Sequence, residues 1–188
     1  LLEKHLWFKE YVLAYTNAST IINPNFNFDD ATGLFNGWDP VTRSYSKEPN
    51  SWDYEYEINP DGSRGAPKTD PTLQNPRCVF QLLKKQVAKY TPEAVANICG
   101  CRPCDIVKVA ELLAQNSGPD KTSAFCYATG FTQHSAGTQI IRTCAILQTL
   151  LGNIGRPGGG ILALRGHSNV QGATDIPTLF AELPNYIP

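Results

Sequence analysis

The chain has 188 residues, of which 41% are hydrophobic and 18% are charged, and its net charge is −1 at pH 7. This balance argues against a general polyanion binder, so we expect no nucleic-acid partner, and no apolar run reaches the roughly 18 residues that could cross a bilayer. The length suffices for the core of one domain or for one piece of a larger architecture. Because the chain opens at Leu1 and contains no methionine, we expect it to be a segment of a longer polypeptide.

The first 28 residues predict one helix and one short strand. Apolar residues recur at roughly helical spacing over 2–15, which is typical of an amphipathic helix. The segment 19–26 then predicts a short strand that Pro24 ends. From 29 to 71 the sequence holds turn signals, charges and scattered aromatic residues without a periodicity of its own. Such an excursion favours a surface insertion or interface loop, since disordered linkers rarely carry so many aromatic residues.

Three helices are predicted after this excursion, and capping residues mark their ends. Asn75-Pro76 predicts the start of a helix over 77–90. Thr91-Pro92 predicts a short helix that stops at Gly100. A third helix is predicted over 105–116, before Ser117-Gly118.

The six cysteines are spaced unevenly, which favours reduced thiols over the disulfide framework of a small secreted domain. Cys99, Cys101 and Cys104 form a C-x-C-x-x-C pattern that superficially resembles half of a metal or cluster site. A complete site needs four ligands, and no second pair or histidine lies nearby at a usual spacing. We therefore favour a structural interpretation, in which Arg102-Pro103 opens a helix, and we expect no metal ligand in the chain.

The last third of the chain predicts an α/β arrangement. The uncharged segment 122–128 is typical of a buried strand. The segment 136–153 predicts a long helix that is apolar almost all round and therefore deeply buried. A strand, a loop and a helix in this order favour an α/β layer, in which ligands bind beyond the carboxyl ends of the strands.

Two loops are candidates for a binding site. The first spans 129–137, directly after the predicted strand, and the second is the glycine-rich stretch 152–172. So many glycines predict that something lies close to this backbone or that unusual dihedral angles are needed. Few residues after 120 are charged, and neutral hydrogen-bonding groups among apolar walls suit a large cofactor rich in heteroatoms.

Familiar motifs do not account for these loops. Residues 158–163 satisfy the pattern G-x-G-x-x-A, but they follow a predicted helix, whereas a dinucleotide site requires a preceding strand. No lysine after Lys121 could complete a phosphate-binding loop of the Walker type. The His134-Ser135 and His167-Ser168 pairs lack a nucleophile elbow, so we do not predict a hydrolase.

The segment YATGFTQHSAGTQIIRTCAILQTLLGNIGRPGGGILALRGHSNVQGATDIPTLF, 127–180, carries a resemblance. It resembles the large catalytic subunit of respiratory molybdenum- or tungsten-dependent formate dehydrogenases, which belong to the dimethyl-sulfoxide-reductase-like family. WFKEYVLAYTNAS and KYTPE, farther upstream, are similar to the same subunit. The resemblance implies part of a layered αβα, Rossmann-like molybdopterin-binding domain with a long irregular, aromatic-rich insertion. The domain boundaries that we expect are 1–28 for a helix and strand of the α/β domain, 29–71 for the insertion, and 72–188 for the cofactor-binding portion.

The resemblance also implies roles for individual residues. By its position in LRGHSNVQG, Arg165 is similar to the family's substrate arginine, and a guanidinium buried in an otherwise neutral pocket suits the carboxylate of formate. His167 would face the same pocket or the pterin edge. The residues expected to contact the cofactor, two molybdopterin guanine dinucleotides with molybdenum or tungsten, are Gly130, Gln133, Gly166, Asn169 and Gln171. Leu162 stands where many relatives have asparagine, so a hydrogen bond at that position is not expected.

Other parts of the family's pattern are missing from the chain. No cysteine precedes a histidine, as the family's metal ligand does, and the motif for the 4Fe-4S cluster is absent. Alone, the chain is expected to be inactive. The implied partners are formate, the remainder of the catalytic subunit, an iron-sulfur beta subunit and a membrane cytochrome subunit, at the periplasmic face of the bacterial inner membrane or in the cytoplasm. The alternatives are another molybdopterin oxidoreductase, such as a nitrate reductase, and a noncatalytic interaction module.

Overall fold

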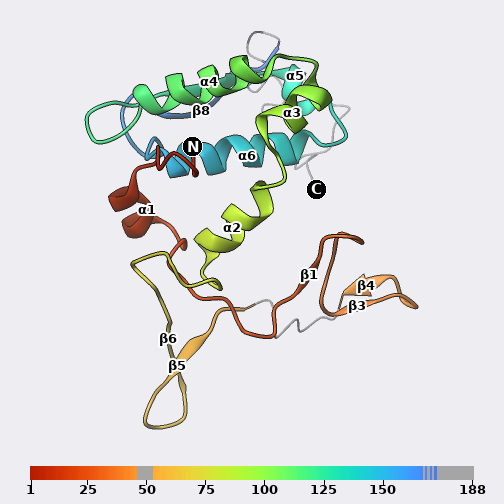
Figure 1. The fold of residues 1–188 in the computed structure, drawn as a ribbon, viewed down its shortest axis with the longest axis vertical. Coiled ribbons are helices and arrows are strands. Elements are labelled where there is room, and N and C mark those ends of the chain that lie inside the picture. The colour runs from red at the N-terminus through yellow and green to blue at the C-terminus, as the bar shows by residue number, and fades with distance from the viewer. Residues whose placement is uncertain (46–52, 167, 169, 171, 173–188) are drawn as a thin grey trace. The chain divides into compact units, whose positions relative to one another are not determined.

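The computed structural model describes residues 1–45, 53–166, 168, 170 and 172. It divides the chain into two units, Leu1–Leu112 and Leu113–Pro188. The described residues include eight strands, all short, and six helices, most of which Figure 1 labels. The mixture of helices and small sheets agrees with the α/β class predicted from the sequence. Within these described residues, no helix is both long enough and apolar enough to cross a membrane.

The first unit contains the helices α1 (Lys9–Tyr15), α2 (Val79–Val87) and α3 (Pro92–Cys99), and most of α4 (Pro103–Gln115). Its core is small and includes the buried Val12, Leu73, Cys78 and Phe80. The extended segment after α1 pairs with the chain before α2 and with the start of that helix, since Ile22 donates its backbone N–H to the Arg77 carbonyl and Phe80 donates its own to the Ala18 carbonyl. This pairing joins elements that lie about 60 residues apart in the sequence.

Helix α1 is shorter than the predicted helix over 2–15, which is a correction to the sequence analysis. Residues 2–5 form turns, and His5 has a left-handed backbone with φ of 52°. Trp7 packs against Phe80, with 4.6 Å between the ring centroids. The apolar spacing of residues 2–8 therefore reflects packing by a turn rather than by a continuous helical face.

The excursion over 29–71 contains three antiparallel hairpins that the sequence did not predict. They pair β1 (Phe28–Asp29) with β2 (Leu34–Phe35), β3 (Trp38–Asp39) with β4 (Ser44–Tyr45), and β5 (Tyr56–Ile58) with β6 (Arg64–Pro67). The first two share one turn design. In each, an aspartate accepts one hydrogen bond from the backbone N–H two residues later and another from a threonine hydroxyl, as Asp29 does with Ala31 and Thr32. Strands of two residues are too short to show alternation, so the pattern gave no strand signal.

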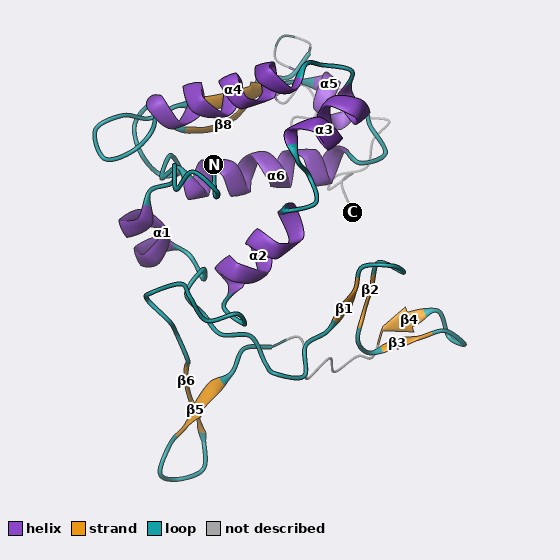
Figure 2. Ribbon diagram, viewed as in Figure 1, coloured by secondary structure: helices purple, strands orange, loops and turns teal. Residues whose placement is uncertain are grey.

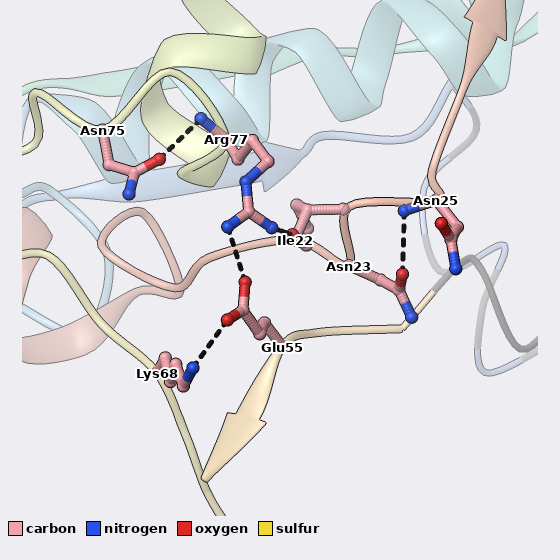
Figure 3. A network of polar contacts seen from close by, with 7 residues as sticks. All are labelled: Ile22, Asn23, Asn25, Glu55, Lys68, Asn75 and Arg77. Atoms are coloured by element: carbon pink, nitrogen blue, oxygen red, sulfur yellow. Dashed lines mark hydrogen bonds and ion pairs between the residues drawn. The ribbon is translucent and has the colours of Figure 1, made fainter.

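An ionic cluster joins the β5–β6 hairpin to the rest of the first unit, as Figure 3 shows. The Glu55 carboxylate lies 2.6 Å from the Lys68 ammonium and 2.6 Å from the Arg77 guanidinium. Arg77 also donates to the backbone carbonyl of Ile22, at 3.0 Å. Hydrogen bonds from Lys68 and then from Arg77 lower the pKa of the Glu55 carboxyl. Since these side chains are partly exposed, the ion pairs fix the position of the hairpin more than they stabilise the fold.

The second unit is built around one parallel strand pair. Strand β7 (Ala124–Tyr127) and strand β8 (Gly160–Ala163) pair in parallel, and α5 (Thr129–Thr132) and α6 (Gly137–Leu150) lie between them in the chain. Helix α6 contacts both α5 and β8, which lie near it in Figure 2. This is the strand, loop and helix order predicted from the sequence.

The expectation that the long helix is buried all round is wrong. Helix α6 buries Cys144, Gln148 and Leu150, but Ile146 is 43% exposed. The two-stranded sheet covers only one stripe of a 14-residue helix, so apolar residues on the other side stay at the surface of this segment.

Candidate functional site

The carboxyl ends of β7 and β8 meet at one edge of the sheet. In the register of the pair, Tyr127 lies opposite Ala163. Just beyond the strand, the Leu164 N–H donates to the Tyr127 carbonyl at 2.8 Å. The loop after β7 and the loop after β8 therefore begin side by side. The sequence analysis treated 152–172 as one loop after the helix, whereas the structure places β8 within that stretch, so the part after Ala163 is the part that begins beside the first loop.

The first loop is held close to its strand by packing and by a tight backbone approach. The rings of Tyr127 and Phe131 stack, with 5.8 Å between centroids and 11° between planes. A Cβ atom on Gly137 would lie 2.7 Å from the Phe131 carbonyl oxygen, so only glycine fits where α6 begins. Within this fixed loop, Gly130 and Gln133 are exposed. A Cβ atom on Gly130 would meet nothing within 4 Å, so the space beside it is open.

The second loop brings Arg165 and Gly166 next to the first. A Cβ atom on Gly166 would lie 3.6 Å from the Thr129 methyl group, which is ordinary contact distance. Arg165 has a φ of 64°, in the left-handed region that disfavours residues other than glycine. The chain turns there, immediately after the last bond between the two strands. A rarely occupied backbone conformation of this kind tends to occur where function needs it.

The exposure of Arg165 differs from the expectation. Arg165 was expected to be buried in a neutral pocket, but it is exposed in this chain. Its loop lies at the edge of a two-stranded sheet, and few elements of the described part of the chain enclose it. His167, Asn169 and Gln171 lie outside the described residues.

The glycines of 152–160 lie at the other end of β8, in the connection from α6. Their own backbone explains much of the pattern that the sequence assigned to a bound group. Gly152, Gly155 and Gly158 have φ between 72° and 76°, which suits glycine. A Cβ atom on Gly159 would lie 2.0 Å from the Asn153 carbonyl oxygen. The group that lies closest to this glycine is therefore the chain itself.

A buried amide pair joins the amino ends of β7 and β8, and the sequence analysis did not predict it. Gln148 and Asn153 are both fully buried. The Gln148 Nε2 donates at 2.7 Å to the carbonyls of Ser123 and Gly160, the residues at the start of the two strands. Asn153 Nδ2 donates to Gln148 Oε1 at 2.8 Å. The available signal was a polar side chain within the apolar run AILQTLLGN, which is unusual for a helix that packs on a sheet.

Nearby polar side chains close the turns at the same end of the sheet. The Arg156 guanidinium donates to the backbone carbonyls of Gly118, at 2.6 Å, and of Gly152, at 3.1 Å. The Thr122 hydroxyl donates to the Pro157 carbonyl at 2.7 Å. The amino ends of the strands thus hold structural contacts, while the carboxyl ends carry exposed polar side chains.

Comparison with curated proteins identifies the relatives of this chain. It is 50% identical over 187 residues to the nitrate-inducible formate dehydrogenase major subunit of Escherichia coli, an alignment that covers 100% of this chain and 18% of that protein. It is 49% identical over 187 residues to the formate dehydrogenase major subunit of Haemophilus influenzae, covering 17% of that protein. It is 45% identical over 186 residues to the formate dehydrogenase 2 subunit alpha (cytochrome c-553) of Nitratidesulfovibrio vulgaris.

The chain is a homologue of one segment of formate dehydrogenase major subunits. It spans less than a fifth of the length of these relatives. No family model matches it. The comparisons agree with the resemblance found in the sequence, which covered nearly the whole chain.

The donors present at the carboxyl ends of β7 and β8 include an amide and a guanidinium, which suit an organic group. Among the residues that the structure describes, no three His, Cys, Asp or Glu side chains gather as metal ligands would. Cys99, Cys101 and Cys104 are exposed and unbridged. The two loops instead present an amide at Gln133, a guanidinium at Arg165 and open space at Gly130. Such groups bind anions, carbonyls and heterocyclic nitrogen atoms.

Proposed function

We propose that residues 1–188 form part of the catalytic subunit of a formate dehydrogenase, which oxidises formate to carbon dioxide. The observation that carries this proposal is the identity of 45–50% to formate dehydrogenase major subunits along virtually the whole chain. The arrangement of the second unit supports it, because polar side chains of two loops meet at the carboxyl ends of parallel strands.

We infer that Arg165 binds the formate carboxylate. A guanidinium stays charged at every working pH and offers two parallel N–H donors to a carboxylate. This part of the chain contains few cations, and Arg156, which donates to backbone carbonyls, lies at the opposite ends of the strands. Arg165 lies at the carboxyl end of β8, beside the loop that carries Gln133. His167 is proposed to orient the substrate from the same loop.

Gly130, Gln133, Gly166, Asn169 and Gln171 are proposed to contact two molybdopterin guanine dinucleotides that hold molybdenum or tungsten. When bound, this group supplies the two-electron redox chemistry. The open space at Gly130 lets a planar group approach the backbone, and the Gln133 amide can both donate and accept hydrogen bonds. The residues of this segment bind and orient the substrate and the cofactor, while electrons leave through iron-sulfur clusters held outside this segment.

The proposed partners follow from the relatives. The name of the Nitratidesulfovibrio vulgaris protein includes a cytochrome, cytochrome c-553. We propose that the subunit works with an iron-sulfur beta subunit and a membrane cytochrome subunit at the periplasmic face of the bacterial inner membrane.

Arg165→Lys in the complete enzyme tests the proposal. Lysine keeps the charge but loses the planar pair of donors, so the KM for formate should rise about tenfold or more, and turnover should fall. Arg142→Lys is the matched control, because Arg142 is exposed on α6 and belongs to neither of the two loops. Unchanged kinetics with Arg165→Lys would remove the role of Arg165. Wild-type activity with nitrate in place of formate would instead favour a nitrate reductase.

A further inference from the structure

We propose that Gln148 and Asn153 act as a register clamp, a positioning pair that fixes where Arg165 stands relative to the loop after β7. The inference that the pair positions a formate site rests on the proposed function. The inference that it sets the register of the strands rests on geometry alone. Both residues lie at the amino ends of β7 and β8, so they would act through the strands on the loops at the carboxyl ends.

The clamp bridges the two strands where they begin. Gln148 reaches from the last turns of α6 and donates one N–H to the Ser123 carbonyl and the other to the Gly160 carbonyl, both at 2.7 Å. Those carbonyls belong to neighbouring strands, so the amide adds a rung before the first pair, Ala124 with Gly160. Because Gln148 is itself held by the helix, this rung fixes both strands against α6.

Asn153 fixes the Gln148 amide in turn. Its Nδ2 donates to Gln148 Oε1 at 2.8 Å and also lies 2.9 Å from the Ser117 hydroxyl. Its Oδ1 accepts the Ser123 backbone N–H at 3.2 Å, and its own N–H donates to the Gln148 carbonyl at 2.8 Å. Every nitrogen and oxygen atom of the two side-chain amides thus has a hydrogen-bond partner. A buried amide without partners would be costly, so the pair holds as a unit or fails as a unit.

The register matters because the pairing is short. β7 and β8 share only four residue pairs. A slip of one residue would move Arg165 by about 3.3 Å along the strand and turn alternate side chains to the other face of the sheet. Neither strand contains a fully buried residue, so apolar contacts alone oppose such a slip only weakly. Two carbonyls bound by one rigid amide do not tolerate it.

The test compares Gln148→Met with Thr149→Val in the complete enzyme. Methionine has a similar length to glutamine but cannot donate a hydrogen bond. Thr149 is the control because its hydroxyl donates to the Ala145 carbonyl within its own helix rather than to a strand carbonyl. The first measurement is hydrogen exchange at the Leu164 amide, which bonds to Tyr127 at the far end of the strands. The second is kcat/KM for formate. Ser117→Ala is a milder variant for use if Gln148→Met does not fold, because it removes a single outer partner of Asn153.

The clamp predicts that Gln148→Met raises exchange at Leu164 by about tenfold or more and lowers kcat/KM for formate roughly 10- to 100-fold. Ser117→Ala should change both in the same direction by a smaller factor, and Thr149→Val should change neither by more than about twofold. Exchange at Leu164 that is unchanged in Gln148→Met, or equally raised in Thr149→Val, would overturn the clamp. Failure of the proposed function has a different signature, namely formate kinetics that do not respond to substitution of Arg165.

Discussion

Gly159→Ala tests the conclusion that the glycine-rich connection is shaped by its own backbone. The added Cβ would lie 2.0 Å from the Asn153 carbonyl oxygen, whereas ordinary contact begins near 3.4 Å, so the two backbones must separate by about 1.4 Å. Asn153 is fully buried and tied to Gln148 and Ser123, so it cannot retreat without loss of hydrogen bonds. Overpacking together with one or two lost bonds gives a destabilisation of about 3 kcal/mol.

The matched control is Gly155→Ala in the same connection. Gly155 has a φ of 73°, but a Cβ atom there meets nothing within 4 Å. Its substitution should therefore cost only the strain of a left-handed residue, about 1 kcal/mol. Denaturant unfolding of the complete subunit, followed by hydrogen exchange of the peptide that spans 153–163, measures both variants. Equal destabilisation by the two substitutions would refute the steric argument.

Two further predictions concern the first loop and the response to acid. Gly130→Ala should leave the free energy of unfolding of the cofactor-free subunit within about 0.5 kcal/mol of the wild type, because the surroundings of Gly130 are open. The same substitution should reduce the cofactor content if a bound group approaches that backbone. Full cofactor content in the purified variant would count against the contact. Hydrogen bonds from the Thr72 side chain and from the backbone N–H groups of Asn75, Thr72 and Gln74 lower the pKa of Asp70 from 3.8 to about 2. The stability that these bonds give is present above pH 3.8 and is lost as the pH falls through about 2, so the free energy of unfolding should fall less steeply over this range in Asp70→Asn than in the wild type. Identical pH profiles for the two proteins would show that Asp70 does not make this contribution.

Local capping chemistry made several elements predictable from the sequence. The Thr91 hydroxyl accepts the Ala94 N–H at 3.2 Å at the start of α3, and Gly100 ends that helix with a φ of 71°. Pro103 opens α4, as predicted. These signals reside in adjacent residues, so they need no knowledge of tertiary contacts.

The incorrect predictions had several causes that the spacing of apolar residues does not reveal. The first turns of the chain gave helical spacing, but Trp7 is placed by Phe80, more than 70 residues away. The hairpins after residue 28 depend on Asx turns such as that of Asp29 with Ala31, and their strands are too short to show a periodicity. Burial of α6 on one side only depends on how many strands cover it.

Part of the candidate site was predictable from the sequence. The loop after β7 was expected at the carboxyl end of a strand, but β8 was not predicted, because a four-residue strand within a glycine-rich stretch gives a weak signal. The Gln148–Asn153 pair was not predicted either: Gln148 stands out as a polar residue in an apolar run, but no sequence pattern marks the backbone carbonyls that it binds. The glycines near Asn153 were assigned to a bound group, because a sequence does not distinguish close approach by a ligand from close approach by the chain itself.

The most direct test of the central claim is the KM for formate of Arg165→Ala and Arg165→Gly in the complete enzyme. Both variants lack the guanidinium, but alanine keeps the strained left-handed backbone of φ 64° and glycine relieves it. If the guanidinium binds the carboxylate, both variants should raise KM about 10- to 100-fold and by similar factors. A KM near the wild-type value in Arg165→Gly would contradict the account, because the conformation of the loop rather than its charge would then determine binding.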